Sequence, residues 1–151
     1  MKHSIFLAIG IAITIAFYAL SYSTGANVFE MLYFNQGFND QLFNLQMYPV
    51  MAAIIALMAW GGAAVYYYVI NSVKFDRWYH WASVLAVCTL LAPIACYAYI
   101  DNKFAHAGLL YIDESIHFVT QILFIEALLF IVASFSIRWW SSNCRHTPFP
   151  Q

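Results

Sequence analysis

Charged residues are scarce in this 151-residue chain. Asp, Glu, Lys and Arg make up 9% of it, against roughly 25% in ordinary globular domains, and hydrophobic residues make up 64%. A soluble fold could not cover its surface with so few charges. The net charge of −1 also provides no basic face to neutralise a phosphate backbone, so nucleic acid is not an expected partner.

Cysteine is also scarce, and motifs for catalysis are missing. The three cysteines include no CxxC pair and cannot build a disulfide framework. Cys88 and Cys96 are eight residues apart in one apolar run, about 12 Å along a helix, which is too far for a disulfide. The sequence has no GxSxG motif, no Gly-rich phosphate loop and no paired intramembrane aspartates. We therefore expect a protein that is not an enzyme and holds no cofactor.

What the chain does contain is four long apolar runs. About 20 helical residues cross a bilayer core, and the runs predict transmembrane helices at about 4–22, 48–70, 78–100 and 116–138. The first run alternates small residues with isoleucine, but a lone strand in lipid would leave its backbone unsatisfied. That run is also longer than a usual signal-peptide core. We predict an all-α integral membrane protein with a single four-helix transmembrane domain over 1–151.

The interval between the first two runs is polar but rich in apolar side chains. Asn27 followed by Glu30 resembles a capping box, and the sequence Asn35-Gln36-Gly37 indicates a helix end. A solvated loop would not carry so many Phe, Leu and Tyr residues. We therefore predict a short amphipathic helical segment at about 27–45, lying at the membrane surface or folded over the bundle.

Two of the predicted spans carry packing signals. In the second span a narrow face consists of alanines at i, i+4, i+7 and i+11, which allows close helix packing: Ala52, Ala56, Ala59 and Ala63. In the third span Pro93 removes a backbone hydrogen bond and frees the carbonyl of Thr89. A kink there fits either a packing device or a hinge, and packing is the preferred interpretation because membrane helices tolerate proline.

Basic residues are distributed unevenly between the two ends of the predicted helices. Four spans place five of them on one side: Lys2, Lys74, Arg77, Arg138 and Arg145. Only Lys103 is on the other side. The positive-inside rule then places both termini in the cytoplasm. We expect a multi-pass protein of the cell inner (plasma) membrane.

Glu126 lies about midway along the fourth span. A charge at bilayer depth costs at least roughly 2.5 to 3.5 kcal/mol, so such a group is normally protonated, paired or turned away from lipid. Thr120, Gln121 and Ser134 form a polar face on this helix, and Glu126 lies about 80° beyond Ser134. Two interpretations stay open: a carboxyl that binds a proton or cation along a pathway or oligomer axis, and a glutamate that joins helices.

Histidine offers a weaker hypothesis of metal or haem binding. His106, Asp113 and His117 gather on the predicted outer side, and imidazole with carboxylate suits zinc. The pattern fixes no third ligand, so a solvated loop leading into a helix is preferred. His80 and His117 begin their helices at opposite sides of a ~30 Å core, so they cannot share one haem iron, whereas His3 with His80 could.

Three functions fit these observations. The first is a homo-oligomeric assembly acting as a channel, membrane sensor or anchor, with Glu126 and the polar face of the fourth helix at its functional interface. Small-residue faces on several helices favour self-association or contact with other membrane subunits. The second is an accessory subunit of a larger respiratory, transport or secretion complex. The third is a metal- or haem-dependent membrane enzyme.

Overall fold

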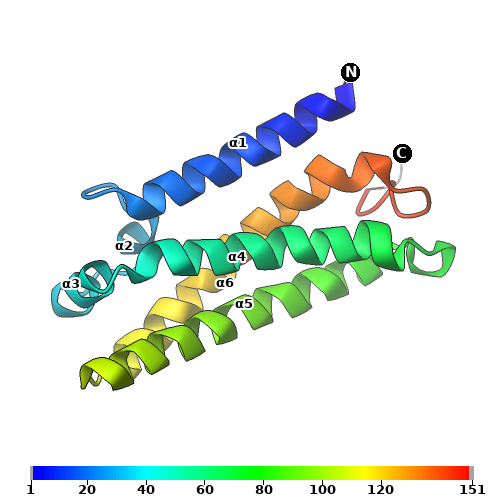
Figure 1. Cartoon of the computed structure of the whole chain (residues 1–151). Helices are drawn as coiled ribbons and strands as arrows, with labels where there is room; N and C mark the ends of the chain where they lie inside the picture. Colours follow the sequence, from blue (N-terminus) through cyan, green and yellow to red (C-terminus); the bar gives the residue numbers. More distant parts are fainter. Residues whose placement is uncertain (1, 150–151) are drawn as a thin grey trace.

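The structure is a computed structural model that describes residues 2–149. These residues form helices and loops, with no strand among them. Four helical segments are long and apolar enough to cross a membrane: His3–Tyr22, Met47–Ile70, Trp78–Ala107 and Ile112–Trp140. The predicted all-α fold with four candidate spans is therefore confirmed, as Figure 1 shows.

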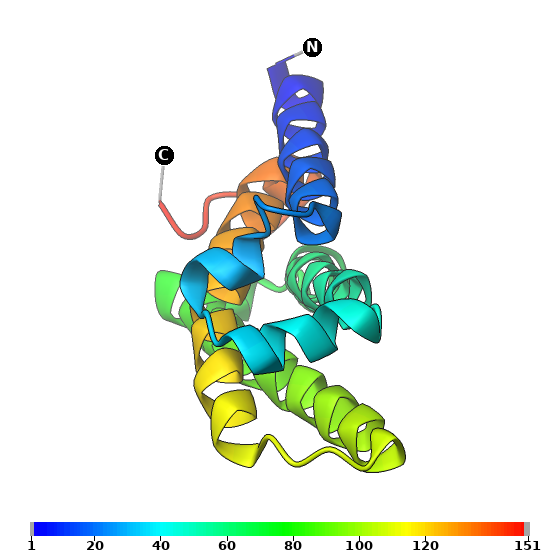
Figure 2. The ribbon, with the colours of Figure 1, turned by 90° about the vertical axis from the view of Figure 1, so that its left-hand side faces the viewer.

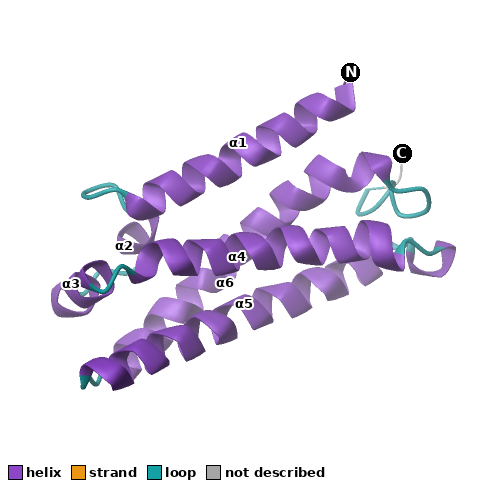
Figure 3. Ribbon diagram, viewed as in Figure 1, coloured by secondary structure: helices purple, strands orange, loops and turns teal. Residues whose placement is uncertain are grey.

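Three of the long helices form the core of the bundle. They are α4 (Met47–Ala64), α5 (Trp78–Ala107) and α6 (Ile112–Ile137), and each packs against the other two. Helix α1 (Lys2–Tyr22) packs on α4 and α6, on the side of the bundle remote from α5 (Figures 1 and 2). Figure 3 shows that the loops are confined to the two ends of the bundle.

The end of the bundle opposite the termini is covered by two short helices, α2 (Val28–Leu32) and α3 (Gln36–Asn44). The side chain of Asn27 accepts the backbone N–H of Phe29, and that of Asn35 accepts the N–H of Phe38, so each helix begins at an asparagine cap. The predicted amphipathic segment is confirmed as this pair of helices. We call residues 23–46 the cap and this end of the bundle the cap end.

The cap is fixed to the bundle by one buried polar side chain and by aromatic packing. Asn39 donates from Nδ2 to the hydroxyl of Tyr48 over 3.0 Å, and its Oδ1 accepts the N–H of Asn35 over 2.8 Å. Phe38 is fully buried, and its ring lies 5.6 Å from that of Phe118 on α6. Burial of such rings stabilises the docked position of α3.

The connection between α5 and α6 is shorter than the sequence predicts. Helix α5 continues past residue 100 to Ala107, and only residues 108–111 separate it from α6. Polar residues such as Lys103 can prolong a helix outside the hydrocarbon core, because their side chains reach water. Gly108 then ends α5, since it adopts the left-handed conformation (φ 67°) that favours glycine.

The opposite end carries both termini, and we call it the terminal end. Here α4 continues as a π-helical segment, η1 (Val65–Ile70), and α6 ends in a 3-10 turn, η3 (Arg138–Trp140). Residues 141–149 form no helix but are held in place. The side chain of Asn71 accepts from Ser141 over 2.9 Å, and the hydroxyl of Tyr67 donates to the carbonyl of Thr147 over 3.1 Å. The tail is thus irregular but docked.

Candidate functional site

Glu126 lies in the core of the bundle rather than against lipid. It belongs to the buried face of α6, and its exposed fraction is 0%. Neither carboxyl oxygen has a hydrogen-bond partner within residues 2–149. An unsatisfied buried polar group costs roughly 1–3 kcal/mol, and an unpaired charge costs more. Such a group is a functional candidate because packing alone gives no reason to place it there.

The neighbours of Glu126 are thiols and closely packed backbones. Cys88 and Cys96 of α5 lie near enough for a charge on the carboxyl to act on them. Thiols are only weak hydrogen-bond donors, so they compensate a carboxylate poorly. A Cβ added to Gly62 of α4 would overlap the Cys88 sulfur and come within 3.2 Å of the Phe130 ring. The three core helices therefore pack closely where Gly62, Cys88 and Phe130 meet, one helical turn from Glu126.

Pro93 lies on the α5 segment between these two cysteines. It is buried, and α5 continues through it as one helix. Because proline has no N–H, the carbonyl of Thr89 lacks its usual helical donor. The Thr89 hydroxyl donates to the carbonyl of Leu85 over 2.7 Å, a bond that does not supply the donor missing at the Thr89 carbonyl. The predicted hinge residues thus lie on the helix that faces Glu126, and whether they move stays a prediction.

The polar face predicted on the fourth helix does not face one environment. Thr120 is exposed, Gln121 is half-buried and Ser134 is fully buried. Ser134 accepts the indole N–H of Trp81 over 3.1 Å. The buried face of α6 is instead set by its bulky apolar residues, which include Phe118, Ile122 and Leu129. Glu126 shares that face, and Ser134 is the only member of the predicted polar set that does so as well.

The alanine face predicted on the second span packs against other helices of the same chain. Ala52, Ala59 and Ala63 have exposed fractions of 0%, and Ala56 is half-buried. The close helix packing that these small residues permit is therefore used between α4 and the other helices of the same bundle. These alanines are therefore not available for contact with a second copy of the chain.

The predicted metal ligands do not form a metal centre. His106 lies in the last turn of α5, and its Nδ1 is 2.7 Å from the carbonyl of Asn102, while Asp113 and His117 are exposed near the start of α6. No group of three His, Cys, Asp or Glu side chains suited to a metal ion occurs within the described part of the chain. The two histidines considered as haem ligands, His3 and His80, lie in different surroundings. His3 stacks on Trp139, whereas His80 packs against Phe75 and Tyr79.

Arg138 is a functional candidate that the sequence does not reveal. Its position at the end of a span predicts an interfacial anchor, yet its exposed fraction is only 6%. The guanidinium carbon lies 4.2 Å from the Trp139 ring and 4.7 Å from the Phe135 ring. Its Nε and Nη1 have no acceptor within residues 2–149. The aromatic neighbours are the only sequence signal, because they allow a cation–π site.

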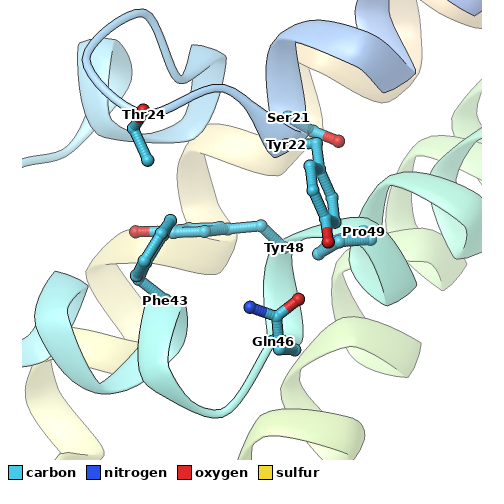
Figure 4. Close-up of a pocket in the computed structure, with 7 residues that line it drawn as sticks. All are labelled: Ser21, Tyr22, Thr24, Phe43, Gln46, Tyr48 and Pro49. Carbon is cyan, nitrogen blue, oxygen red and sulfur yellow. The ribbon is translucent and has the colours of Figure 1, made fainter.

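A cavity of about 190 Å³ lies at the cap end, between α1, α3 and α4 (Figure 4). It is lined by Ser21, Tyr22, Thr24, Phe43, Gln46, Tyr48 and Pro49. These side chains include no acid, lysine, arginine or histidine, so they offer neither a general base nor a counter-charge. Glu126 does not line this cavity.

The fold and the buried carboxyl together define a small multi-pass membrane protein with an unpaired acid in its helix core. The chain matches no known family, curated protein or solved structure in the comparisons made.

Proposed function

We propose that this protein is a membrane sensor that works as a homo-oligomer, with Glu126 binding a proton or cation inside the bundle. The observation that carries the proposal is the 0% exposure of Glu126, together with two carboxyl oxygens that lack a partner within residues 2–149. An anchor needs no such group. A channel lined by Glu126 needs water at the carboxyl, and this conformation offers it none.

A change of charge at Glu126 cannot be accommodated without movement. Glu126 is 0% exposed, and the helices pack tightly around Gly62, Cys88 and Phe130, the last of which lies one helical turn from Glu126. Ionisation therefore favours a conformation in which α4, α5 and α6 separate enough to solvate the group. Helix α5 is the element best able to yield, because Pro93 has already removed one backbone hydrogen bond beside this site.

Self-association is supported by the outer face of α1. Ala8, Ala12 and Ala16 lie at i, i+4 and i+8 and are exposed, so they form a small-residue face that another helix can approach closely. The location proposed is the inner (plasma) membrane with both termini in the cytoplasm. Its support is the uneven charge, since Lys74, Arg77, Arg138 and Arg145 belong to the terminal end and Lys103 to the cap end.

Pulsed electron paramagnetic resonance tests the sensor role. Spin labels are attached at two lipid-facing positions, Leu57 on α4 and Leu90 on α5, through genetically encoded amino acids, so that the native cysteines stay in the core. In lipid nanodiscs the distance between the labels should change when the pH is raised from acidic to alkaline. Glu126→Gln should abolish that change, because its side chain cannot ionise.

Asp113→Asn is the matched control, since it neutralises an exposed acid on the same helix. It should leave the change in distance intact. In the labelled protein that keeps Glu126 and Asp113, a distance that does not change with pH would refute the sensor role. Passage of ions through vesicles containing the protein, lost in Glu126→Gln, would instead favour the channel.

A further inference from the structure

The terminal end carries a basic hollow of about 270 Å³. Its wall consists of His3 on α1, Trp139 at the end of α6, and Arg145 and His146 in the docked tail. No acidic side chain is among these lining residues. The hollow therefore suits an anion better than a cation or a neutral ligand.

Hydrogen-bond donors without acceptors lie beside this hollow. They are the Nε and Nη1 atoms of Arg138 and the indole Nε1 of Trp139, all three buried and without a partner within residues 2–149. Arg138 is 6% exposed, and its guanidinium lies 4.2 Å from the Trp139 ring that lines the hollow. These three donors without acceptors suit a group rich in acceptor oxygens, such as a phosphate.

The hollow adjoins an apolar groove between α1 and α6. This groove has a volume of about 200 Å³ and is lined chiefly by Phe6, Ile9 and Ile13 of α1 and by Ile131, Val132 and Phe135 of α6. Phe6, which lines the groove, stacks on Trp139, which lines the hollow, at 5.6 Å between ring centroids, and His3 stacks on the same ring at 4.9 Å, so the two spaces are neighbours.

The hollow and the groove together have a length that suits the upper part of a lipid. The groove extends along α1 from Phe6 to Ile13, a helical rise of about 10 Å, and hollow and groove together extend about 15 Å from His3, half of a ~30 Å hydrocarbon core. At the floor of the groove Gly10 meets Ser136 so closely that an added Cβ would overlap the serine side chain. The helices touch at this point but leave the groove open beside it.

We propose that this site binds one anionic glycerophospholipid. Its phosphate enters the basic hollow against Arg145, His146 and His3, and one acyl chain occupies the groove between α1 and α6. Arg138 adds its charge from behind the Trp139 ring and reaches the phosphate oxygens by a small shift of these two side chains. A free phosphate ion fits the hollow as well, but it would leave the apolar groove unfilled.

Lipid titration followed by native mass spectrometry tests this proposal on the full chain, freed of lipid in detergent. Phosphatidylglycerol should be retained more strongly than phosphatidylcholine. Arg145→Gln removes one exposed charge from the hollow and should weaken phosphatidylglycerol binding about fivefold, the effect of roughly one basic residue at a membrane surface. Lys103→Gln, at the cap end, should leave binding unchanged.

A second pair of variants separates the groove from the charge. Ile13→Trp fills the groove and should abolish selective retention with every basic residue intact, whereas Ile11→Trp changes an exposed residue of α1 that does not line it. Helix content by circular dichroism confirms that both variants fold.

Three results would overturn the proposal. The first is equal retention of phosphatidylglycerol and phosphatidylcholine. The second is retention of inorganic phosphate as strong as that of phosphatidylglycerol. The third is unchanged retention of phosphatidylglycerol in Ile13→Trp. If a second copy of the chain covered the groove, lipid would be retained only by monomers. That result would also contradict the proposal.

Discussion

Replacing Glu126 by methionine should stabilise the protein. Both carboxyl oxygens are buried and lack partners within residues 2–149, so their burial costs roughly 1–3 kcal/mol of unfolding free energy. Methionine is unbranched and of similar length, and it packs adaptably without polar oxygens. A gain of about 1 to 3 kcal/mol corresponds to a rise in the unfolding midpoint of about 2 to 12 °C for a chain of this length.

The assay is thermal unfolding in detergent, followed by loss of circular dichroism. Ser134→Ala is the matched control on the same helix, because it removes the acceptor of the Trp81 indole N–H and should lower stability. The advantage of Glu126→Met should widen as the pH rises, since a buried carboxylate costs more than a buried acid. A destabilised Glu126→Met would refute the reasoning, because the carboxyl would then have a partner outside this chain.

Three further predictions concern the packing and the docked tail. Gly62→Ala should lower the unfolding free energy by roughly 1–3 kcal/mol, because the added Cβ overlaps Cys88, whereas Gly61→Ala, with nothing near its Cβ, should change it little. Adding Cys88→Ala to Gly62→Ala should restore the midpoint of thermal unfolding. Burial raises the pKa of the Cys144 thiol, so at a given pH less of it is the reactive thiolate. Cys144 should therefore be alkylated far more slowly than a cysteine placed at exposed Ser142, and equal rates would contradict its burial. Asn71→Ala removes three side-chain hydrogen bonds to the tail and should speed tryptic cleavage after Arg145; an unchanged digestion rate would count against the docked tail.

The spans could be predicted because the bilayer makes length and apolarity decisive. In lipid an apolar run of about 20 residues has one good solution, a helix, so runs in the sequence translate directly into elements of the fold. The cap of α2 was equally readable, since Asn27 acts on a backbone group only two residues away. Local chemistry was sufficient for these features. The prediction of a helix end at Asn35-Gln36-Gly37 is wrong: Asn35 is the N-cap of α3, because its side chain accepts the N–H of Phe38, and Gln36 and Gly37 form the first turn of that helix.

Features that depend on which face meets the core could not be predicted in the same way. A helical wheel gives the angle between Thr120 and Glu126 but not the direction of the bundle. The residues of the predicted polar face therefore lie in different surroundings: Thr120 is exposed, whereas Glu126 is buried. The length of α5 depended on Gly108 rather than on where apolar residues end. The burial of Arg138, at 6% exposure, depends on tertiary packing at the terminal end, which the local sequence does not show.

Infrared spectroscopy of the protein in bilayers tests most directly whether the carboxyl of Glu126 lacks a partner. Recorded at acidic pH, the carbonyl stretch of a free carboxylic acid lies at higher frequency than that of a hydrogen-bonded one. We predict a free-acid band that Glu126→Gln removes and Asp113→Asn leaves in place. A spectrum in which Glu126→Gln removes only a hydrogen-bonded acid band would contradict an unpaired acid in the helix core.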